Sequence, residues 1–308
     1  MVVFLNPYCS YGRGFARWQS IESDLRSRLS PFTIEVMNSP EILYARVSQL
    51  LKAGETAFIA AGGDGTVNLL LNALMQAGAS GCNVCLGAIG LGSSNDYHKP
   101  FGEREMVRNI PVRINTHSAL ASDILRINYL ESENHHKINY CSNNASIGIT
   151  AEANALFNEQ PGFVKVMRKY SINLAIAVTA IKTILTYRNI PCRIAADGKG
   201  SDAVMTTNIG VVKNPYFAGS LSYEPVVRHG DGMLGIHVCA DMSRLQALKI
   251  LSRLSQGRFK GYPNTSTWKS NHLIVTSDHL FALEFDGEVV RTNRVEFSVM
   301  TQAIRCCQ

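Results

Sequence analysis

The sequence predicts a two-domain α/β protein, with an open parallel sheet in the N-terminal domain and an antiparallel β sandwich in the C-terminal domain. The chain has 308 residues, and a domain typically holds roughly 100–200 residues. Up to about residue 120, strand-like and helix-like segments alternate, which is typical of β-α-β units with right-handed crossovers. Beyond that point, short strand-like segments separated by Asp-Gly turns predominate, as in an antiparallel sheet.

The N-terminal elements follow from the hydrophobic pattern. The segment Ala57–Ala61 is fully apolar, so we expect a central, parallel strand there. Between Gly14 and Leu29 apolar residues recur at helical spacing, and Ser39 followed by Pro40 is a typical helix start. The predicted strands are Val2–Asn6, Phe32–Met37, Ala57–Ala61 and Val84–Ile89. The predicted helices are Gly14–Leu29, one that begins at Ser39–Glu41, and Thr66–Ala77.

The C-terminal half shows strand-like patterns around one helical segment. Ser122–Leu130 and Ile138–Ser142 alternate in polarity on either side of Glu131–Lys137, which predicts a hairpin. A single helical zone is predicted over Phe163–Tyr187. Further strands are predicted at Cys192–Ala196, Ala203–Val212, Gly235–Ala240, Leu273–Thr276, Leu280–Phe285 and Arg294–Met300.

Composition narrows the class of protein. Hydrophobic residues make up 46% and charged residues 18%, as in a folded globular protein. The net charge is +6 without a run of five like charges, so we expect no nucleic-acid partner. The longest apolar segment, Ile172–Leu185, is shorter than the ~20 residues that cross a bilayer. We therefore expect a cytoplasmic protein, and we leave open a peripheral membrane contact and a homodimer.

The segment Gly62-Gly63-Asp64-Gly65-Thr66 carries the strongest chemical signal. It follows an apolar strand and opens a helix, and ligands bind open α/β sheets at the carboxyl ends of strands. Glycines let the backbone approach a phosphate, and a helix N-terminus offers free N–H groups. Thr66 can donate its hydroxyl to a phosphate, whereas Asp64 needs a metal or a cation beside it. A simple tight turn is the competing interpretation.

Five segments in order resemble the diacylglycerol kinase-like lipid kinases of the bacterial YegS/diacylglycerol kinase type, which are related to sphingosine kinases. The segments are Asn6-Pro7 with Gly12–Gly14, Gly62–Leu74, Leu86–Tyr97, Asp231–Leu234 and Asp286–Glu288. NAD kinases and phosphofructokinases share only the glycine pentapeptide. The resemblance implies a Rossmann-like nucleotide domain at residues 1–121 plus 292–308 and a lipid-substrate β sandwich at 122–291.

The same resemblance implies ATP-dependent phosphorylation of a lipid alcohol, diacylglycerol-like or sphingoid-like, with ATP and Mg²⁺ in the cleft between the domains. Asp286 matches the general base, and Asp64, Asp96 and Glu288 match the catalytic acidic network. The implied nucleotide-binding residues are Asn6, Arg13, Gly62, Gly63, Asp64, Gly65, Thr66, Gly92, Ser93, Ser94 and Asn95.

Three positions depart from the family pattern. Leu69 follows Asn68 where an acidic residue is usual, and the first loop is extended by Tyr8–Tyr11. The family's structural Mg²⁺ site would use Asp231 and the Met233 carbonyl, but its second Asp is Arg228 here. Arginine cannot ligate a cation and could pair with Asp231, so we expect this metal to be lost.

Two other functions remain open at this point. The first is a soluble small-molecule kinase such as an NAD kinase, which would release ADP with NAD and without lipid. The second is a nucleotide-binding regulator without catalysis, in which the change Asp286→Asn would have no measurable effect.

Overall fold

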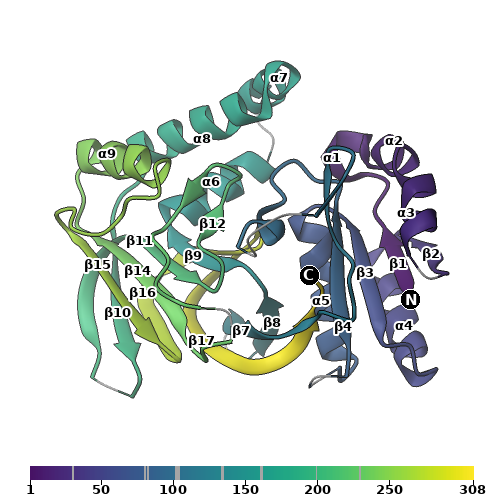
Figure 1. Ribbon diagram of the computed structural model, residues 1–308. Helices are drawn as coiled ribbons and strands as arrows, with labels where there is room; N and C mark the ends of the chain where they lie inside the picture. The colour runs from purple at the N-terminus through teal and green to yellow at the C-terminus, as the bar shows by residue number, and fades with distance from the viewer. Residues whose placement is uncertain are drawn as a thin grey trace.

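One hydrogen-bonded sheet runs through both halves of the protein (Figure 1). A computed structural model describes residues 1–29, 31–79, 81, 83–100, 105–132, 135–159, 162–198, 200–228 and 230–308. Its main strand order is β15-β14-β11-β10-β16-β17-β4-β3-β1-β2. The predicted mixed α/β class is confirmed.

The strands are β1 Val2–Leu5, β2 Thr33–Val36, β3 Ala57–Gly62, β4 Cys85–Gly90, β5 Glu105–Val107, β6 Ile110–Arg113, β7 Leu120–Ser132, β8 His135–Cys141, β9 Asn144–Gly148, β10 Ile190–Ala196, β11 Asp202–Val212, β12 Tyr216–Phe217, β13 Leu221–Ser222, β14 Leu234–Ala240, β15 Thr265–Ser270, β16 His272–Phe285 and β17 Glu288–Cys306. The helices are α1 Cys9–Gly12, α2 Gly14–Gln19, α3 Glu22–Arg28, α4 Pro40–Lys52, α5 Asp64–Gln76, the 3-10 helix η1 Asp96–His98, α6 Ile149–Asn158, α7 Gly162–Tyr170, α8 Ile172–Thr186 and α9 Arg244–Leu254.

In the N-terminal half, β1 pairs in parallel with β2 and β3, and β3 pairs in parallel with β4. Side chains alternate between two apolar layers because successive residues of a strand point to opposite faces. Phe58 packs in the cluster that contains α4 and α5 residues, whereas Ile59 packs in the cluster that contains Trp18 and Leu25 of α2 and α3. Both faces of these strands are therefore covered by helices.

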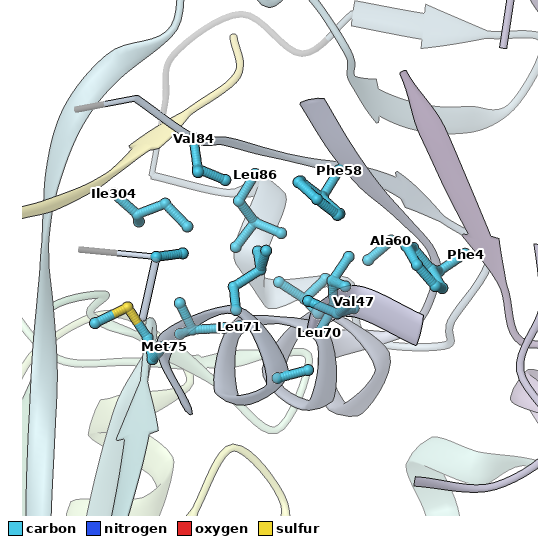
Figure 2. Close-up of a cluster of buried hydrophobic side chains, with 14 of the residues drawn as sticks. Phe4, Val47, Phe58, Ala60, Leu70, Leu71, Met75, Val84, Leu86 and Ile304 are labelled. Carbon is cyan, nitrogen blue, oxygen red and sulfur yellow. The ribbon is translucent and has the colours of Figure 1, made fainter. Parts of the chain in front are cut away.

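Helix α5 is held against the sheet by its own apolar face. Figure 2 shows Leu70 and Leu71 of α5 under the strands that carry Phe58 and Leu86, with Met75 further along the helix. Leu70 and Leu71 are fully buried. This packing fixes the N-terminus of α5, and with it the glycine loop, at the carboxyl end of β3.

Strand β17 joins the two halves. It has 19 residues and pairs antiparallel with β16 at its start and with β7 further along. Its end pairs in parallel with β4, through Arg305 and Cys306. In Figure 1 this strand is the yellow arc between the two halves. The domain boundaries predicted at residues 121 and 292 fall inside β7 and β17, so continuous strands cross both of them.

Several predicted elements differ from the structure. The predicted helix Gly14–Leu29 is two helices, α2 and α3, because Ser20 donates its hydroxyl to the Arg17 carbonyl (2.7 Å) and the chain bends there. The predicted helical zone Phe163–Tyr187 is likewise divided into α7 and α8. Ser171 is extended between them, and its side chain accepts from the Leu174 N–H as the α8 cap.

In the second half the strands are longer than predicted. The segment predicted as the turn Glu131–Lys137 is largely strand, since β7 reaches Ser132 and β8 begins at His135. The two strands predicted at Leu273–Thr276 and Leu280–Phe285 are one strand, β16, with an irregular register between them. The elements β9, α6, β12, β13, α9 and β15 of this half were not predicted.

We expect the change Leu70→Ala to lower the free energy of unfolding by about 2–5 kcal/mol, because it removes a fully buried side chain and leaves a cavity under the sheet. Urea unfolding would measure it. The matched control is Leu245→Ala in α9, where the side chain is 62% exposed and the expected change is within about 0.5 kcal/mol. Equal losses in the two variants would contradict this role for Leu70.

Candidate functional site

A cleft of 610 Å³ lies where the carboxyl ends of β3 and β4 face β9, α6 and the β16–β17 turn. Its floor on the N-terminal side is formed by the two glycine loops that follow β3 and β4. Its lining residues are Asn6, Tyr8, Cys9, Ser10, Gly63, Asp64, Gly65, Thr66, Gly92, Ser93, Ser94, Asp96, Asn143, Asn144, Thr150, Asn154, Asn158, Phe217, Ala218, Glu284, Asp286 and Gly287.

The two glycine loops are in backbone contact. A Cβ atom on Gly92 would lie 2.4 Å from the Cα of Gly63, and a Cβ on Gly63 would lie 3.2 Å from the Cα of Gly92. The Gly62 carbonyl also accepts from the N–H groups of Leu91 (2.8 Å) and Gly92 (3.2 Å). Only glycine allows this approach, so the two loops form one continuous backbone surface at the N-terminus of α5.

Thr66 and Asn6 close this surface on one side. The Asn6 amide donates to Thr66 Oγ1 (3.0 Å), and the Asn6 N–H donates to the Ala61 carbonyl (2.9 Å). A Cβ on Gly62 would lie 2.2 Å from Thr66 Oγ1, so the glycine makes room for that hydroxyl. With the positive end of the α5 dipole behind it, the surface suits a phosphate group.

The loop after β4 is held from inside by side chains. Arg17 of α2 donates to the carbonyls of Leu91 and Gly92, both at 2.7 Å. Asn95, with a φ of 49°, donates to the carbonyls of Gly90 (3.0 Å) and Gly92 (3.1 Å). Asn95 therefore shapes the loop and does not line the cleft. Sequence reasoning missed Arg17 because nothing local links it to a loop 74 residues away.

Four carboxylates face the cleft: Asp64, Asp96, Glu284 and Asp286. Asp64 Oδ1 accepts from the Tyr97 N–H (2.8 Å). Burial, together with the nearby charge of Asp96, raises the pKa of Asp64. Asp96 forms an ion pair with Lys99, and its Oδ2 accepts from the Gly219 N–H (3.2 Å). The carboxylates of Asp64 and Asp96 thus lie close enough for their charges to interact.

Asp286 occupies a two-residue hairpin turn and faces the cleft at the same time. Phe285 pairs with Glu288, and Asp286 and Gly287 have φ values of 45° and 93°, as a type I′ turn requires. Oδ2 of Asp286 accepts from the Ser142 N–H (3.2 Å). Burial raises the pKa of Asp286 to about 7, with the Glu284 charge adding to the effect.

Glu284 was not among the predicted site residues. It lies two residues before Asp286 on β16 and is 4% exposed. Its side chain accepts from the Ser146 hydroxyl (2.7 Å) and the Gly287 N–H (2.8 Å). Burial nevertheless raises its pKa to about 7. The cleft therefore holds two carboxyl groups that titrate near neutrality.

Several predicted site residues do not line the cleft. Arg13 is exposed, and Glu288 is exposed on β17. Gly62 is buried behind Thr66, and Asn95 points into its own loop. Asp231 lies elsewhere, at the turn before β14, where it pairs with Lys213. The remaining predicted residues, from Asn6 to Asp286, are brought together as lining residues.

The opposite wall is polar and was missed by the sequence prediction. Thr150, Asn154 and Asn158 of α6 all line the cleft. Their spacing of four residues places them on one face of the helix. This spacing is the signal that could have identified them, once α6 itself had been predicted.

The pH dependence of stability reports on the two carboxyl groups. Their ordinary pKa values are 3.8 for Asp286 and 4.5 for Glu284, and the folded values are about 7. At pH values between the unfolded and the folded pKa values, the folded protein holds protons that the unfolded chain has released. The free energy of unfolding therefore falls as the pH rises through this range. We expect Asp286→Asn to lose less stability between pH 5 and pH 8 than the wild type, as measured by urea unfolding.

The control for this experiment is Asp278→Asn, which changes an exposed residue of the same strand. Its free energy of unfolding should differ between pH 5 and pH 8 by as much as that of the wild type. If the free energy of unfolding of Asp286→Asn also changed by the wild-type amount between pH 5 and pH 8, Asp286 would not titrate in this way.

Comparisons with known proteins agree with this architecture. The model of the "YegS C-terminal NAD kinase beta sandwich-like domain" matches residues 143–308, and that of the "Diacylglycerol kinase catalytic domain" matches residues 1–127. A Staphylococcus epidermidis protein named "Putative lipid kinase" is 24% identical over 249 residues, which cover 79% of this chain and 74% of that protein. A Staphylococcus haemolyticus protein with the same description is 25% identical over 251 residues, covering 79% and 73%.

A solved structure of a diacylglycerol kinase from Bacillus anthracis str. Sterne has the same fold. Its TM-score is 0.69 at 15% identity, and the match covers 99% of this chain and 95% of that one. Because the two family models span both halves of the chain, and the C-terminal one alone matches more than half of it, this protein belongs to the YegS/diacylglycerol kinase-like family of lipid kinases.

Proposed function

We propose that the protein transfers the γ-phosphoryl group of ATP to the hydroxyl group of a lipid alcohol. The observation that carries this proposal is the placement of a phosphate-type glycine surface and a buried carboxylate, Asp286, in one cleft. Phosphoryl transfer depends on positioning and charge stabilisation more than on covalent chemistry, and a cleft lined from both halves can supply positioning.

The nucleotide phosphates would lie over Gly63, Gly65 and the N-terminus of α5. Ser93 and Ser94 of the second loop line the same side and can donate hydroxyl groups. Asn6 supports this side by holding Thr66 in place. This arrangement uses backbone N–H groups and a helix dipole to bind anionic oxygens.

The charge balance of the cleft supports Mg²⁺ as the second cofactor. Four carboxylates line it, one of which, Asp96, is paired with Lys99, and none of its lining residues in the described part of the chain is Lys or Arg. Nucleotide phosphates would be repelled there without a cation. The described residues include no group of three or more His, Cys, Asp or Glu that could hold a metal by themselves. Mg²⁺ fits this setting because one or two carboxylates, phosphates and water usually bind it.

Asp64 and Asp96 would hold the ion beside the glycine surface. When bound there, Mg²⁺ would supply positive charge against the negative charge of the phosphate groups. The protein's own part is to hold the phosphates on the Gly63–Gly92 surface and to keep Asp64 in place through the Tyr97 N–H.

Asp286 would act as the general base. A pKa of about 7 suits this role, since the group is partly ionised at neutral pH and still binds a proton well. The lipid hydroxyl would give its proton to the Asp286 carboxylate as its oxygen bonds to the γ-phosphorus. The bond from that phosphorus to the β–γ bridging oxygen of ATP would break in the same step, so ADP leaves. The Ser142 N–H holds the carboxylate in place, and Glu284 tunes it through its charge.

We expect Asp286→Asn to lower the rate of ADP release about 100-fold or more in the presence of ATP, Mg²⁺ and a lipid alcohol, because the amide cannot accept the proton. A coupled ADP assay with a panel of diacylglycerols, sphingoid bases and prenols would measure it. Asp278→Asn, an exposed change in the same strand, should keep the wild-type rate.

The same assay separates the alternatives. ADP release with NAD and without lipid would favour a soluble small-molecule kinase. Tight nucleotide binding without turnover on any acceptor, unchanged by Asp286→Asn, would favour a nucleotide-binding regulator. Either result would remove the lipid kinase proposal.

Access to a lipid substrate could involve α8. No helix in the described part of the chain is long and apolar enough to cross a membrane. Leu174, Ile181 and Leu185 of α8 are 43–48% exposed, and their spacing places them on one face of the helix. Figure 1 shows α7 and α8 projecting from the top of the molecule. We propose that this face contacts the membrane surface.

The double change Ile181→Glu and Leu185→Glu should abolish most of the co-sedimentation of the protein with phospholipid vesicles, because charge on an apolar face opposes insertion. Leu245→Glu on α9, a residue that is 62% exposed, is the matched control and should bind as the wild type does. Equal binding by all three proteins would refute this contact.

A further inference from the structure

The ammonium group of Lys213 is enclosed by oxygen atoms. Its Nζ lies 3.0 Å from Oδ2 of Asp123, 3.1 Å from Oδ1 of Asp231, 2.8 Å from the Met233 carbonyl and 3.4 Å from the Arg228 carbonyl. The side chains of Lys213 and Asp123 are 4% and 0% exposed. Burying a lysine ammonium costs free energy unless the charge is paired. Here two carboxylates and two carbonyls surround it.

The two carboxylates are also held by backbone N–H groups. Asp123 accepts from Gly232 (2.8 Å) and Gln302 (3.0 Å). Although burial raises the pKa of Asp123, these hydrogen bonds and the Lys213 ammonium outweigh it and keep the pKa below its ordinary value. We call Lys213, the Asp123 and Asp231 carboxylates and the Arg228 and Met233 carbonyls the Lys213 cage. The cage connects β7, the turn before β14 and the later part of β17.

Asp231 completes the cage from the turn. It accepts from the N–H groups of Arg228 (2.8 Å) and Met233 (3.1 Å), and exposed Lys269 lies 3.5 Å from its Oδ2. The Arg228 side chain does not supply the positive charge beside Asp231, contrary to the expectation from the sequence. The ammonium at the centre of the cage is that of Lys213, and Arg228 contributes its backbone N–H and carbonyl.

These residues do not fit a structural Mg²⁺ ion. The resemblance to the family implies a metal on Asp231 and the Met233 carbonyl, and Lys213 occupies the space between these two oxygens. Mg²⁺ needs oxygen ligands at about 2.0–2.1 Å, so it would collide with the ammonium and be repelled by its charge.

We infer that Lys213 is a built-in cation that replaces a structural divalent metal in this chain. The cage carries two negative charges, and a lysine supplies one positive charge permanently tethered to β11 and its following loop. The junction of β7, β14 and β17 is then stable without any metal. This role of Lys213 does not depend on enzymatic activity, so the proposed function can fail without affecting it.

The cage is also tied to the candidate site. The backbone N–H groups of Lys213 and Asn214 both donate to the Asn143 carbonyl at 2.9 Å. The Asn214 amide donates to the Asp96 carbonyl (2.8 Å) and to Oδ1 of Asn143 (2.9 Å). A metal-independent cage would therefore hold the Asp96 loop in place whether divalent ions are bound elsewhere or not.

Thermal unfolding with and without divalent ions tests the inference. The wild type in EDTA should have the same melting temperature as in millimolar Ca²⁺ or Mg²⁺ at matched ionic strength and without nucleotide. Lys213→Ala should melt roughly 5 °C or more lower in EDTA, because two buried carboxylates lose their partner. Ca²⁺ should then recover at least about 2 °C of the loss by entering the vacated cage.

Two controls make the result specific. Lys269→Ala removes the exposed lysine from the same Asp231 and should change the melting temperature by less than about 1 °C, with no response to Ca²⁺. Lys213→Ala combined with Asp231→Asn should lose the Ca²⁺ response, because the cage then lacks one carboxylate.

Calorimetric titration of the wild type keeps the inference testable even if Lys213→Ala does not fold. Wild type and Asp231→Asn should take up Ca²⁺ and Mg²⁺ identically in the absence of nucleotide. A stoichiometric site present in the wild type and absent in Asp231→Asn would overturn the inference. A Lys213→Ala protein as stable as Lys269→Ala would overturn it as well.

Discussion

The structure depends on the continuity of strand β17. Its 19 residues start at the turn that carries Asp286 and end beside β4, which carries the second glycine loop. The strand is paired with β16, β7 and β4 in turn, with an irregularity between Met300 and Ile304, so the turn and the loop belong to one hydrogen-bonded sheet. The cleft is the space between them.

The structure holds two acidic clusters, and their surroundings differ. Asp123 and Asp231 enclose the Lys213 ammonium, and Lys269 lies beside Asp231, so two cations of the chain offset these two carboxylates. In the cleft, Asp64, Glu284 and Asp286 have raised pKa values, and no Lys or Arg of the described residues lines it. The first cluster is paired with cations of the chain, whereas the three carboxyl groups with raised pKa values in the cleft have no lysine or arginine among the described lining residues.

The cleft also shows how backbone geometry serves two purposes. The Asp286-Gly287 turn closes the β16–β17 hairpin and aims a carboxylate at the glycine surface. The Gly63–Gly92 contact joins two loops and leaves the backbone exposed to a ligand. In both places the requirement of the fold and that of the site select the same residue type, which is why these short motifs were recognisable.

Local signals in the sequence determined the order of most strands and helices, the two glycine loops and the Asp286 turn. Such features depend on residues close together along the chain, through periodicity, capping and turn geometry. Only the tertiary structure decided which carboxylates became buried and which cation met them. Glu284 titrates near neutrality because of what packs around it, and Lys213 meets Asp123 from 90 residues away. Burial and long-range pairing arise from packing, and no pattern within one segment records them.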